Sequence, residues 1–456
     1  YGAQLPAAVR EVLQASSDHE ASKRTQSDSA ALAVQFGVAL ILVFGLAFHW
    51  AAVGLIGLMV IILLTAFNGV IDEHRIGIAG SFENTIAIGA NYHTSNGGTD
   101  GFFSTYNVTS KQWVDSVALG SSLDDEFNSF VHLTNGSYVA LGTTKGNVSQ
   151  HSSIQGAPEC TPTAPATSTQ CTILLYLDNA LVPNHIQTIE STGSVLGTAI
   201  TEVGTSGKTL VAGYFNREML TYPPNVHVND LPLESQNNGN DIFIGRFGQN
   251  GDFENLNIFG GNGSDLVYDI HAYGNGYILG GITQSTPNST PMVTYPPNAN
   301  WVAPTGFGNR DMIILQTTTS GAITDGFLLG TSGHDLLYSI EVNDVGLVHM
   351  AGYIGTSWLL ETNQTIGQPD TRSVFHGIVN LSGGNNSHLI QAHASTGSNT
   401  GDGIAFAVTA TSEDDVWLGG RMIAGAQSNT FFGNSASGFE SISVFGLTPI
   451  FLRSIS

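Results

Sequence analysis

A short apolar strand that ends in glycine recurs along most of the chain, and this repeat constrains the fold more than any other feature. The six copies read TIAIGAN, YVALGTT, LVAGYF, ILGGIT, HMAGYI and VWLGGR. Their anchoring glycines are Gly89, Gly142, Gly213, Gly281, Gly352 and Gly420, and after the first, shorter interval the copies are almost evenly spaced. Such a period is typical of an architecture in which each repeat is one supersecondary unit.

Each repeat contains three further strand-like segments. One opens with Asp and aromatic or aliphatic residues, a second ends in Leu-Gly or Phe-Gly, and a third follows a Gly/Ser/Asp turn, as in GNGSDLVYDI. Alternating apolar residues between turn residues predict β-strands. Four short strands per repeat predict an all-β fold, a six-bladed β-propeller, with a seven-bladed ring as the alternative.

The ends of the repeat region carry partial units. Gly77–Tyr92 matches only the last two strands of a unit, and Gly438–Ser456 matches only the first two. We therefore predict that strands from both ends form one sheet and close a propeller over residues 77–456, which leaves no open edge. The repeats resemble the bacterial β-propeller repeats known as SBBP, as in GNDIFIGRFGQNGDFENLNIFGGNGSDLVYDIHAYGNGYILGGIT. This resemblance implies the fold but no particular activity.

Charge divides the chain into two unlike parts. The chain has 36 acidic and 13 basic residues, and its net charge is −23. Residues 1–77 hold 6 acids and 4 bases, which leaves 30 acids, 9 bases and a charge of −21 on the repeats. A chain so poor in Lys and Arg cannot neutralise many phosphates, and we therefore expect no nucleic-acid partner.

Residues 31–69 form an apolar segment that has no charged residue. Because a membrane-spanning helix needs about 20 residues, we predict two short transmembrane helices in contact with lipid, Ala31–Phe48 and Ala51–Phe67. A single tilted span with an interfacial segment is the alternative. Residues 1–30 are predicted to form a polar helical flank, whose basic residues favour the cytoplasmic side; these are Arg10, Lys23 and Arg24.

Residues 1–77 resemble an internal stretch of the NhaB sodium/proton antiporters. The resemblance rests on YGAQLPAAVREVLQ, on the apolar VGLIGLMVIILL and on GVIDEHRIG. It implies a membrane segment that further helices would follow in that family, whereas here Ile78 begins the repeats. An isolated helix pair lacks the intramembrane site that antiport needs, so no transport residue is carried over.

Two functional hypotheses follow. In the first, the chain is a membrane-attached, non-enzymatic propeller that acts in binding, adhesion or scaffolding. In the second, it contains a fragment of a NhaB-type antiporter, in a chain whose two parts were fused or misassembled. A single membrane span would place the propeller outside the cytoplasm, and two spans would place it inside.

The two cysteines bear on this choice of side. Cys160 and Cys171 flank a Pro/Thr-rich stretch, and a loop-closing disulfide between them would indicate an oxidising compartment. With the low lysine content, this favours an extracytoplasmic or cell-surface propeller.

Acidic residues recur at fixed places in the repeats, and we interpret them as turn caps that accept backbone hydrogen bonds. These residues are Asp100, Asp241 and Asp311, and Asp125, Asp265, Asp335 and Asp402. The densest acidic group, Asp124, Asp125 and Glu126, is a calcium candidate, although the chain has no Asp-x-Asp-x-Asp run. The sequence shows no zinc motif, nucleophile elbow or phosphate-binding loop, and we therefore predict no enzyme activity.

Long insertions follow the glycine-ended strands and are expected to link one unit to the next. Two of them share Tyr-Pro-Pro-Asn, which begins at Tyr222 and at Tyr295, and the second lies near Trp301. Aromatic residues on loops of a rigid scaffold commonly contact ligands. Tyr222, Tyr295 and Trp301 are therefore candidate contacts for a glycan or protein ligand; in the alternative interpretation they only fasten the link over the sheet.

Overall fold

The computed structural model describes most of the chain after residue 66. The described residues are 67–72, 74–146, 170–217, 219, 239–261, 263–284, 293–295, 309–343, 345–359, 365–367, 369, 372–381, 388–396, 400–410, 416–424, 430–434, 438–442 and 450–455. The predicted flank at residues 1–30 and nearly all of the predicted membrane segment lie outside them. Among the described residues, no helix has the length and apolar character that crossing a membrane requires.

The described part is all-β, and its strands form antiparallel sheets that follow one another along the chain, except that β15, β26 and β27 each join an earlier sheet. The first sheet contains β1 (Phe67–Asp72), β2 (Arg75–Ile88), β3 (Asn91–Asn107) and β4 (Gln112–Leu119). The second contains β5 (Asp125–His132), β6 (Tyr138–Thr144), β7 (Cys171–Leu177) and β8 (Pro183–Ile189). The third comprises β9 (Val195–Glu202), β10 (Thr209–Phe215), β11 (Asp241–Phe247), β12 (Phe253–Gly260) and the short β15 (Val293–Tyr295).

The later sheets continue the series. The fourth contains β13 (Asp265–Tyr273), β14 (Gly276–Thr283), β16 (Asp311–Thr318) and β17 (Ile323–Leu329). The fifth contains β18 (Leu336–Val342), β19 (Leu347–Ile354), β22 (Ser373–Asn380), β23 (His388–Thr396), β26 (Thr430–Asn434) and β27 (Gly438–Ile442). The sixth contains β24 (Thr400–Ala410), β25 (Val416–Ala424) and β28 (Ile450–Ile455), and β20 (Trp358–Leu359) pairs only with β21 (Thr365–Ile366).

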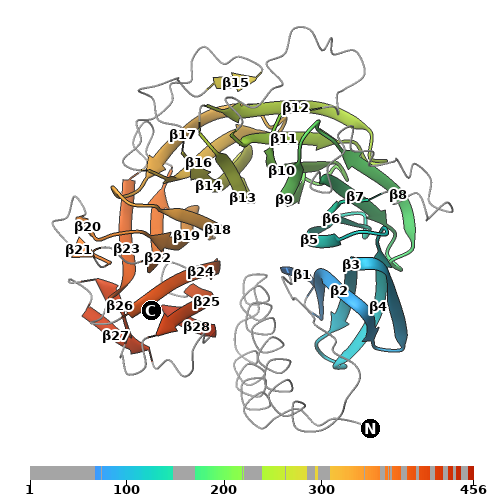
Figure 1. Cartoon of the computed structure of the whole chain (residues 1–456), viewed down its shortest axis with the longest axis horizontal. Helices are drawn as coiled ribbons and strands as arrows, with labels where there is room; N and C mark the ends of the chain where they lie inside the picture. Colours follow the sequence, from blue (N-terminus) through green and yellow to red (C-terminus); the bar gives the residue numbers. More distant parts are fainter. Residues whose placement is uncertain are drawn as a thin grey trace.

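The sheets stand side by side around a common centre, which is a propeller-like arrangement (Figure 1). The first strand of each sheet lies nearest the centre, and these inner strands contact one another in the order β5, β9, β13, β18 and β24. Apolar side chains fill the space between neighbouring sheets. Leu210 and Ile244 of the third sheet, for example, share one buried cluster with Leu279 and Ile313 of the fourth. Burial of these facing surfaces stabilises the stack of sheets.

The sheets are out of phase with the sequence repeats by two strands. The Gly/Ser/Asp turn at residues 260–265 carries the chain from β12 of one sheet to β13 of the next. The long insertion at residues 284–310 instead joins β14 to β16, which pair within one sheet from Thr283↔Asp311 onward. The sequence suggested that the long insertions link one sheet to the next. In the structure they instead connect two strands of the same sheet. The second to fifth sheets each take the last two strands of one repeat and the first two strands of the following repeat.

This phase removes the need for the predicted composite sheet. β2, which contains most of Gly77–Tyr92, pairs with β1 and β3, so the start of the repeat region completes its own sheet. β27 pairs with β26, and β28 pairs with β25. No described sheet combines strands from both ends of the chain, and in this respect the structure differs from the prediction.

The all-β part also begins earlier than residue 77. β1 starts at Phe67, inside the predicted membrane segment 31–69, and pairs with β2 from Phe67↔Ala79 to Asp72↔Arg75. Asp72 and His74, which follow that segment in the sequence, lie at the turn between these strands. Antiporter-like residues therefore supply the inner strand of the first sheet.

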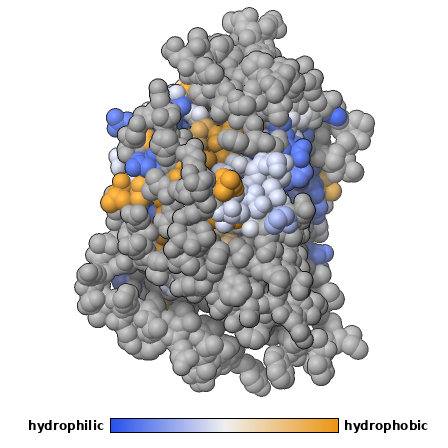
Figure 2. Space-filling view, turned by 90° about the vertical axis from the view of Figure 1, so that its left-hand side faces the viewer, coloured by the Kyte–Doolittle hydropathy of each residue, from blue (hydrophilic) through white to orange (hydrophobic). Residues whose placement is uncertain are grey.

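Both apolar and polar residues reach the molecular surface. Figure 2 shows the side that carries the later sheets, where hydrophobic residues lie among hydrophilic ones.

Candidate functional site

The acidic group at residues 124–126 is divided among three environments. Asp124 lies at the surface and pairs with Lys145, whose Nζ is 2.9 Å from Asp124 Oδ2. Asp125 is buried, and its Oδ2 accepts a hydrogen bond from the backbone N–H of Ser121 at 2.5 Å. Glu126 Oε1 accepts a hydrogen bond from the hydroxyl of Thr143 at 3.3 Å. In the part of the chain that the structure describes, no group of three or more His, Cys, Asp or Glu residues is arranged to hold a metal ion.

The recurring acids do cap turns between sheets. Asp265 Oδ2 accepts the N–H of Gly261 at 2.9 Å, and Asp335 Oδ2 accepts the N–H of Thr331 at 2.5 Å, as Asp125 does from Ser121. These contacts confirm the interpretation for the three residues. The backbone contact from Asp335 N to Arg310 O is matched by that from Gly403 N to Arg372 O, so Gly403 rather than Asp402 occupies the corresponding position.

The capping acids occur together with a second buried acid. A Cβ atom on Gly330 would lie 2.5 Å from Asp311 Oδ1 and 2.9 Å from Asp335 Oδ2, so both carboxyl groups flank one point. Asp100 and Asp125 form a second buried pair, in which burial raises the pKa of Asp100 to about 6 and the charge of Asp125 contributes to the increase. Two carboxyl groups this close disfavour each other's ionisation.

The predicted binding-loop and disulfide residues are only partly described. Tyr222 and Trp301 lie outside the described residues. Tyr295 is in β15, where its backbone pairs with Ile258 of β12. Cys171 is disulfide-bonded, and the only other cysteine in the sequence, Cys160, lies outside the described residues.

A repeated bulge on the inner strands provides the strongest candidate site. In each of five inner strands, one residue is skipped in the pairing with the following strand. The skipped residues follow the period of the repeat, and they are Asn128, Thr198, Tyr268, Tyr338 and Phe406. A bulge of this kind re-aims a side chain and is often found beside functional sites.

Aromatic rings occupy the bulge on three consecutive inner strands. The ring centroids of Tyr268 and Tyr338 are 5.2 Å apart, and those of Tyr338 and Phe406 are 5.3 Å apart. Tyr338 also lies 6.5 Å from Tyr353 of β19. Phe406 is 44% exposed, so the row of rings reaches the surface at β24. We call Tyr268, Tyr338 and Phe406 the aromatic row.

Two arginines lie beside the aromatic row. Arg372 Cζ is 5.6 Å from the centre of the Tyr353 ring, a cation–π distance. Burial raises the pKa of Tyr353, while the charges of Arg372 and Arg310 lower it, so both guanidinium groups lie close to the Tyr353 phenol. Arg310 likewise opposes the increase in the pKa of Tyr268 that burial causes.

A charged cluster lies further along the same inner strands. The ring of His271 is within 3.5 Å of Asp269 Oδ1 and 3.6 Å of Glu341 Oε1. Burial by itself would lower the pKa of His271, but the two carboxylates raise it to about 9. Asp269 also joins the neighbouring strand, because its Oδ2 accepts hydrogen bonds from Ser339 Oγ at 3.1 Å and Ile340 N at 2.9 Å. The cluster therefore connects β13 to β18.

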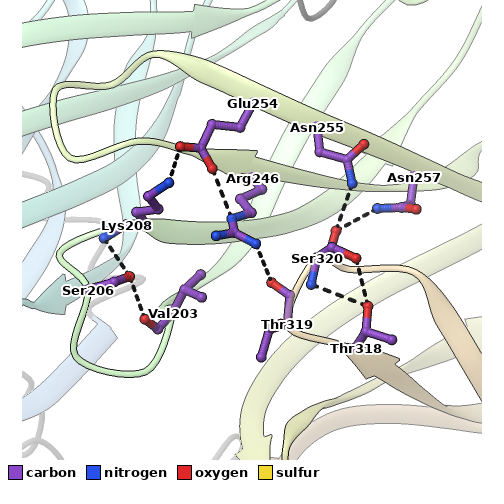
Figure 3. A network of polar contacts seen from close by, with 10 residues as sticks. All are labelled: Val203, Ser206, Lys208, Arg246, Glu254, Asn255, Asn257, Thr318, Thr319 and Ser320. Carbon is purple, nitrogen blue, oxygen red and sulfur yellow. Dashed lines mark hydrogen bonds and ion pairs between the residues drawn. The ribbon is translucent and has the colours of Figure 1, made fainter.

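The turn between β16 and β17 takes part in a polar network that joins the fourth sheet to the third (Figure 3). Arg246 pairs with Glu254 at 3.0 Å and donates to the carbonyl of Thr319 at 3.3 Å. Asn255 and Asn257 both donate to the carbonyl of Ser320, at 3.0 and 2.9 Å. These groups are used in contacts between sheets, which indicates a structural role.

Sequence reasoning missed the aromatic row. His132 lies four residues after the skipped Asn128 and His271 lies three residues after the skipped Tyr268, so the two histidines do not occupy the same position of the repeat. His132 packs on Tyr138, with ring centroids 4.8 Å apart, whereas His271 lies between two acids. The occurrence of Tyr268 and Tyr338 at one position of successive repeats is the signal that could have revealed the row.

Comparison with known proteins adds information about the first part of the chain. Residues 1–120 match the family model of the bacterial Na+/H+ antiporter B (NhaB). The antiporter NhaB of Marinobacter nauticus is 62% identical over 79 residues, which are 17% of this chain and 16% of that protein. NhaB of Pseudomonas aeruginosa (strain LESB58) is 61% identical, with the same coverage. The chain thus spans about one sixth of the length of these relatives.

Two solved structures align with most of the chain at low similarity. An acylaminoacyl peptidase from Pyrococcus horikoshii aligns over 83% of this chain and 46% of its own, with 9% identity and a TM-score of 0.35. The Dos1 propeller aligns over 79% of this chain and 90% of its own, with 9% identity and a TM-score of 0.29.

Proposed function

We propose that this chain is a membrane-attached, non-enzymatic β-propeller that binds a ligand at the aromatic row. In this proposal the six sheets are the blades of one ring, and one or two helices within residues 31–69 hold the ring at a membrane. The observation that carries the binding function is the aromatic row itself. Rings on three neighbouring inner strands, with Phe406 at the surface, provide a rigid apolar area of the kind that binding sites use.

The similarity to NhaB supports the proposed membrane attachment, and the disulfide supports the proposed side of the membrane. NhaB antiporters are membrane-embedded proteins, and residues 1–120 match their family model. A disulfide at Cys171 is typical of an oxidising compartment, which favours an extracytoplasmic propeller. Protease protection in right-side-out and inverted vesicles tests the orientation: cleavage of the propeller only in inverted vesicles would reverse this assignment.

Glycan and protein arrays probed with the full chain in detergent test the binding function. We expect a ligand whose retention falls at least tenfold in Phe406→Ala. Leu359→Ala, which also removes an exposed apolar side chain but lies on β20, should retain it. Equal loss in both variants, or no loss in either, would reject the aromatic row as the binding surface. The loop candidates Tyr222, Tyr295 and Trp301 stay predictions, and alanine variants on the same arrays test them.

A second function is favoured by the 62% identity to NhaB over 79 residues. In this alternative the chain is a fragment of an antiporter and contributes to sodium/proton exchange. It predicts sodium-dependent proton flux in vesicles that contain the chain. Absence of flux in vesicles where insertion is verified would reject the alternative.

A further inference from the structure

One arginine beside the aromatic row has a buried nitrogen that makes no hydrogen bond. Arg310 precedes β16, and its Nε is buried without a hydrogen-bond partner. The ion pairs among the described residues do not include Arg310. A buried N–H group without a hydrogen-bond partner is costly. The chain has 36 acids and 13 bases, so a half-buried arginine without an acidic partner is unexpected.

A second arginine occupies the matching place in the next sheet. The carbonyl of Arg310 accepts the N–H of Asp335 just before β18, and the carbonyl of Arg372 accepts the N–H of Gly403 in β24, both at 2.9 Å. Both residues thus lie at the end of the sheets where the inner strands begin. Arg372 Cζ lies 5.6 Å from the centre of the Tyr353 ring, and the charge of Arg310 also acts on the Tyr353 phenol, as does that of Asp335.

The arginines and the rings together define a ligand chemistry. A guanidinium binds a carboxylate through two parallel hydrogen bonds, and aromatic rings bury the apolar face of a ring-shaped body. The net charge of −21 on residues 78–456 repels polyanions, so only a ligand with few charges benefits from the two guanidinium groups.

We propose that Arg310 and Arg372 bind the carboxylate of a small, singly charged ligand whose ring packs on the aromatic row. The shared chemistry is a monocarboxylate on a six-membered ring, which a sugar acid and an aromatic acid both provide. This inference rests on the proposed binding function and specifies its ligand class.

Calorimetric titration of the full chain in detergent tests the inference. The probes are glucuronate and benzoate, with glucose and benzyl alcohol as their uncharged counterparts. We expect one of the acids to bind at least tenfold more tightly than its counterpart. The acid that binds identifies the source, and added salt should weaken its binding because the contact is ionic.

Arginine variants separate the contact from a general charge effect. Arg310→Gln should weaken binding of the acid at least tenfold, and Arg310→Lys should restore only part of it, because lysine keeps the charge without the two-pronged geometry. Lys145→Gln makes the same change in net charge at a surface ion pair far along the sequence, and it should bind like the parent. Arg372→Gln provides a second test if Arg310→Gln does not fold, as judged by circular dichroism.

The outcomes distinguish this inference from the proposed function. If neither acid binds, or if Arg310→Gln and Arg372→Gln bind as the parent does, the carboxylate site is rejected. If an uncharged counterpart binds as tightly as its acid and Phe406→Ala abolishes that binding, the carboxylate site is rejected but the aromatic row remains a binding surface. Binding of an acid that depends on both arginines but not on Phe406 would reject the role of the row.

Discussion

Tyr338 and Phe406 belong to successive repeats, yet their rings meet at 5.3 Å with an interplanar angle of 62°. Each is the skipped residue of a bulge, on the neighbouring inner strands β18 and β24. The contact therefore depends on two local irregularities that recur with the repeat. An edge-to-face pair of this kind contributes about 0.5–1.5 kcal/mol beyond the area that it buries.

Tyr338→Ala should destabilise the fold by about 2–4 kcal/mol, because it removes a ring that contacts Tyr268, Tyr353 and Phe406. Urea unfolding followed by circular dichroism measures the change. The matched control is Tyr92→Ala, whose ring is 77% exposed and whose loss should cost less than about 0.5 kcal/mol. Equal effects of the two changes would contradict the packing role of Tyr338.

Asp100 should make the fold less stable as the pH rises from about 4 to 6. Burial raises its pKa from 3.8 to about 6, so the folded state holds the proton more tightly than the unfolded state does. In Asp100→Asn, the decrease in unfolding free energy over this pH range should be smaller by about 1–3 kcal/mol. Unfolding midpoints across pH 4–7 provide the measurement. Asp252→Asn, at an exposed turn, is the control and should leave the dependence unchanged.

His271 should carry its proton at neutral pH. Burial opposes the charge, but Asp269 and Glu341 raise the pKa of His271 to about 9. The raised value means that the ion cluster stabilises the fold below pH 6.5 and that this stabilisation is lost as the pH rises towards 9. Glu341→Gln should lower the pKa of His271 by at least one unit in an NMR titration of the imidazole. Glu83→Gln, an exposed change, should leave the titration where it was.

Gly281→Ala should lower the free energy of unfolding by more than about 3 kcal/mol. A Cβ atom there would lie 2.0 Å from the carbonyl oxygen of Leu266, and that backbone belongs to the bulged inner strand β13. Gly136→Ala is the control, since a Cβ there meets nothing within 4 Å and only the positive φ of 88° opposes the change. The control should cost about 1 kcal/mol by thermal or urea unfolding. A similar loss of stability at both sites would show that the close contact with Leu266 is not what excludes a larger residue at Gly281.

The period, the strands and the turn-capping acids could be predicted from the sequence because each depends on local chemistry. The phase of the sheets could not. A short Gly/Ser/Asp turn fits either a hairpin or a crossing between sheets, and a long insertion such as residues 284–310 resembles a link between blades. The pairing of β14 with β16 depends on the apolar faces that these strands bury. The sequence of a single turn does not specify that pairing.

The aromatic row escaped prediction for a related reason. Alternation along a strand assigns every second residue to one face, and a bulge breaks that rule at one position. Tyr268 and Tyr338 therefore could not be placed on a face until the skipped position was known. The candidate loops could be selected from the sequence because Tyr-Pro-Pro-Asn occurs in two of them, whereas Tyr268, Tyr338 and Phe406 are single residues in three successive repeats.

The two-strand offset between repeats and sheets has a consequence for how such a chain can change. Deleting one complete repeat removes half of two adjacent sheets, but the remaining halves have the same pairing pattern and can join as one full sheet. Duplication adds one full sheet by the same logic. The genetic unit and the structural unit thus differ in their boundaries while matching in size, so recombination can alter the number of sheets without leaving an unpaired strand at the junction.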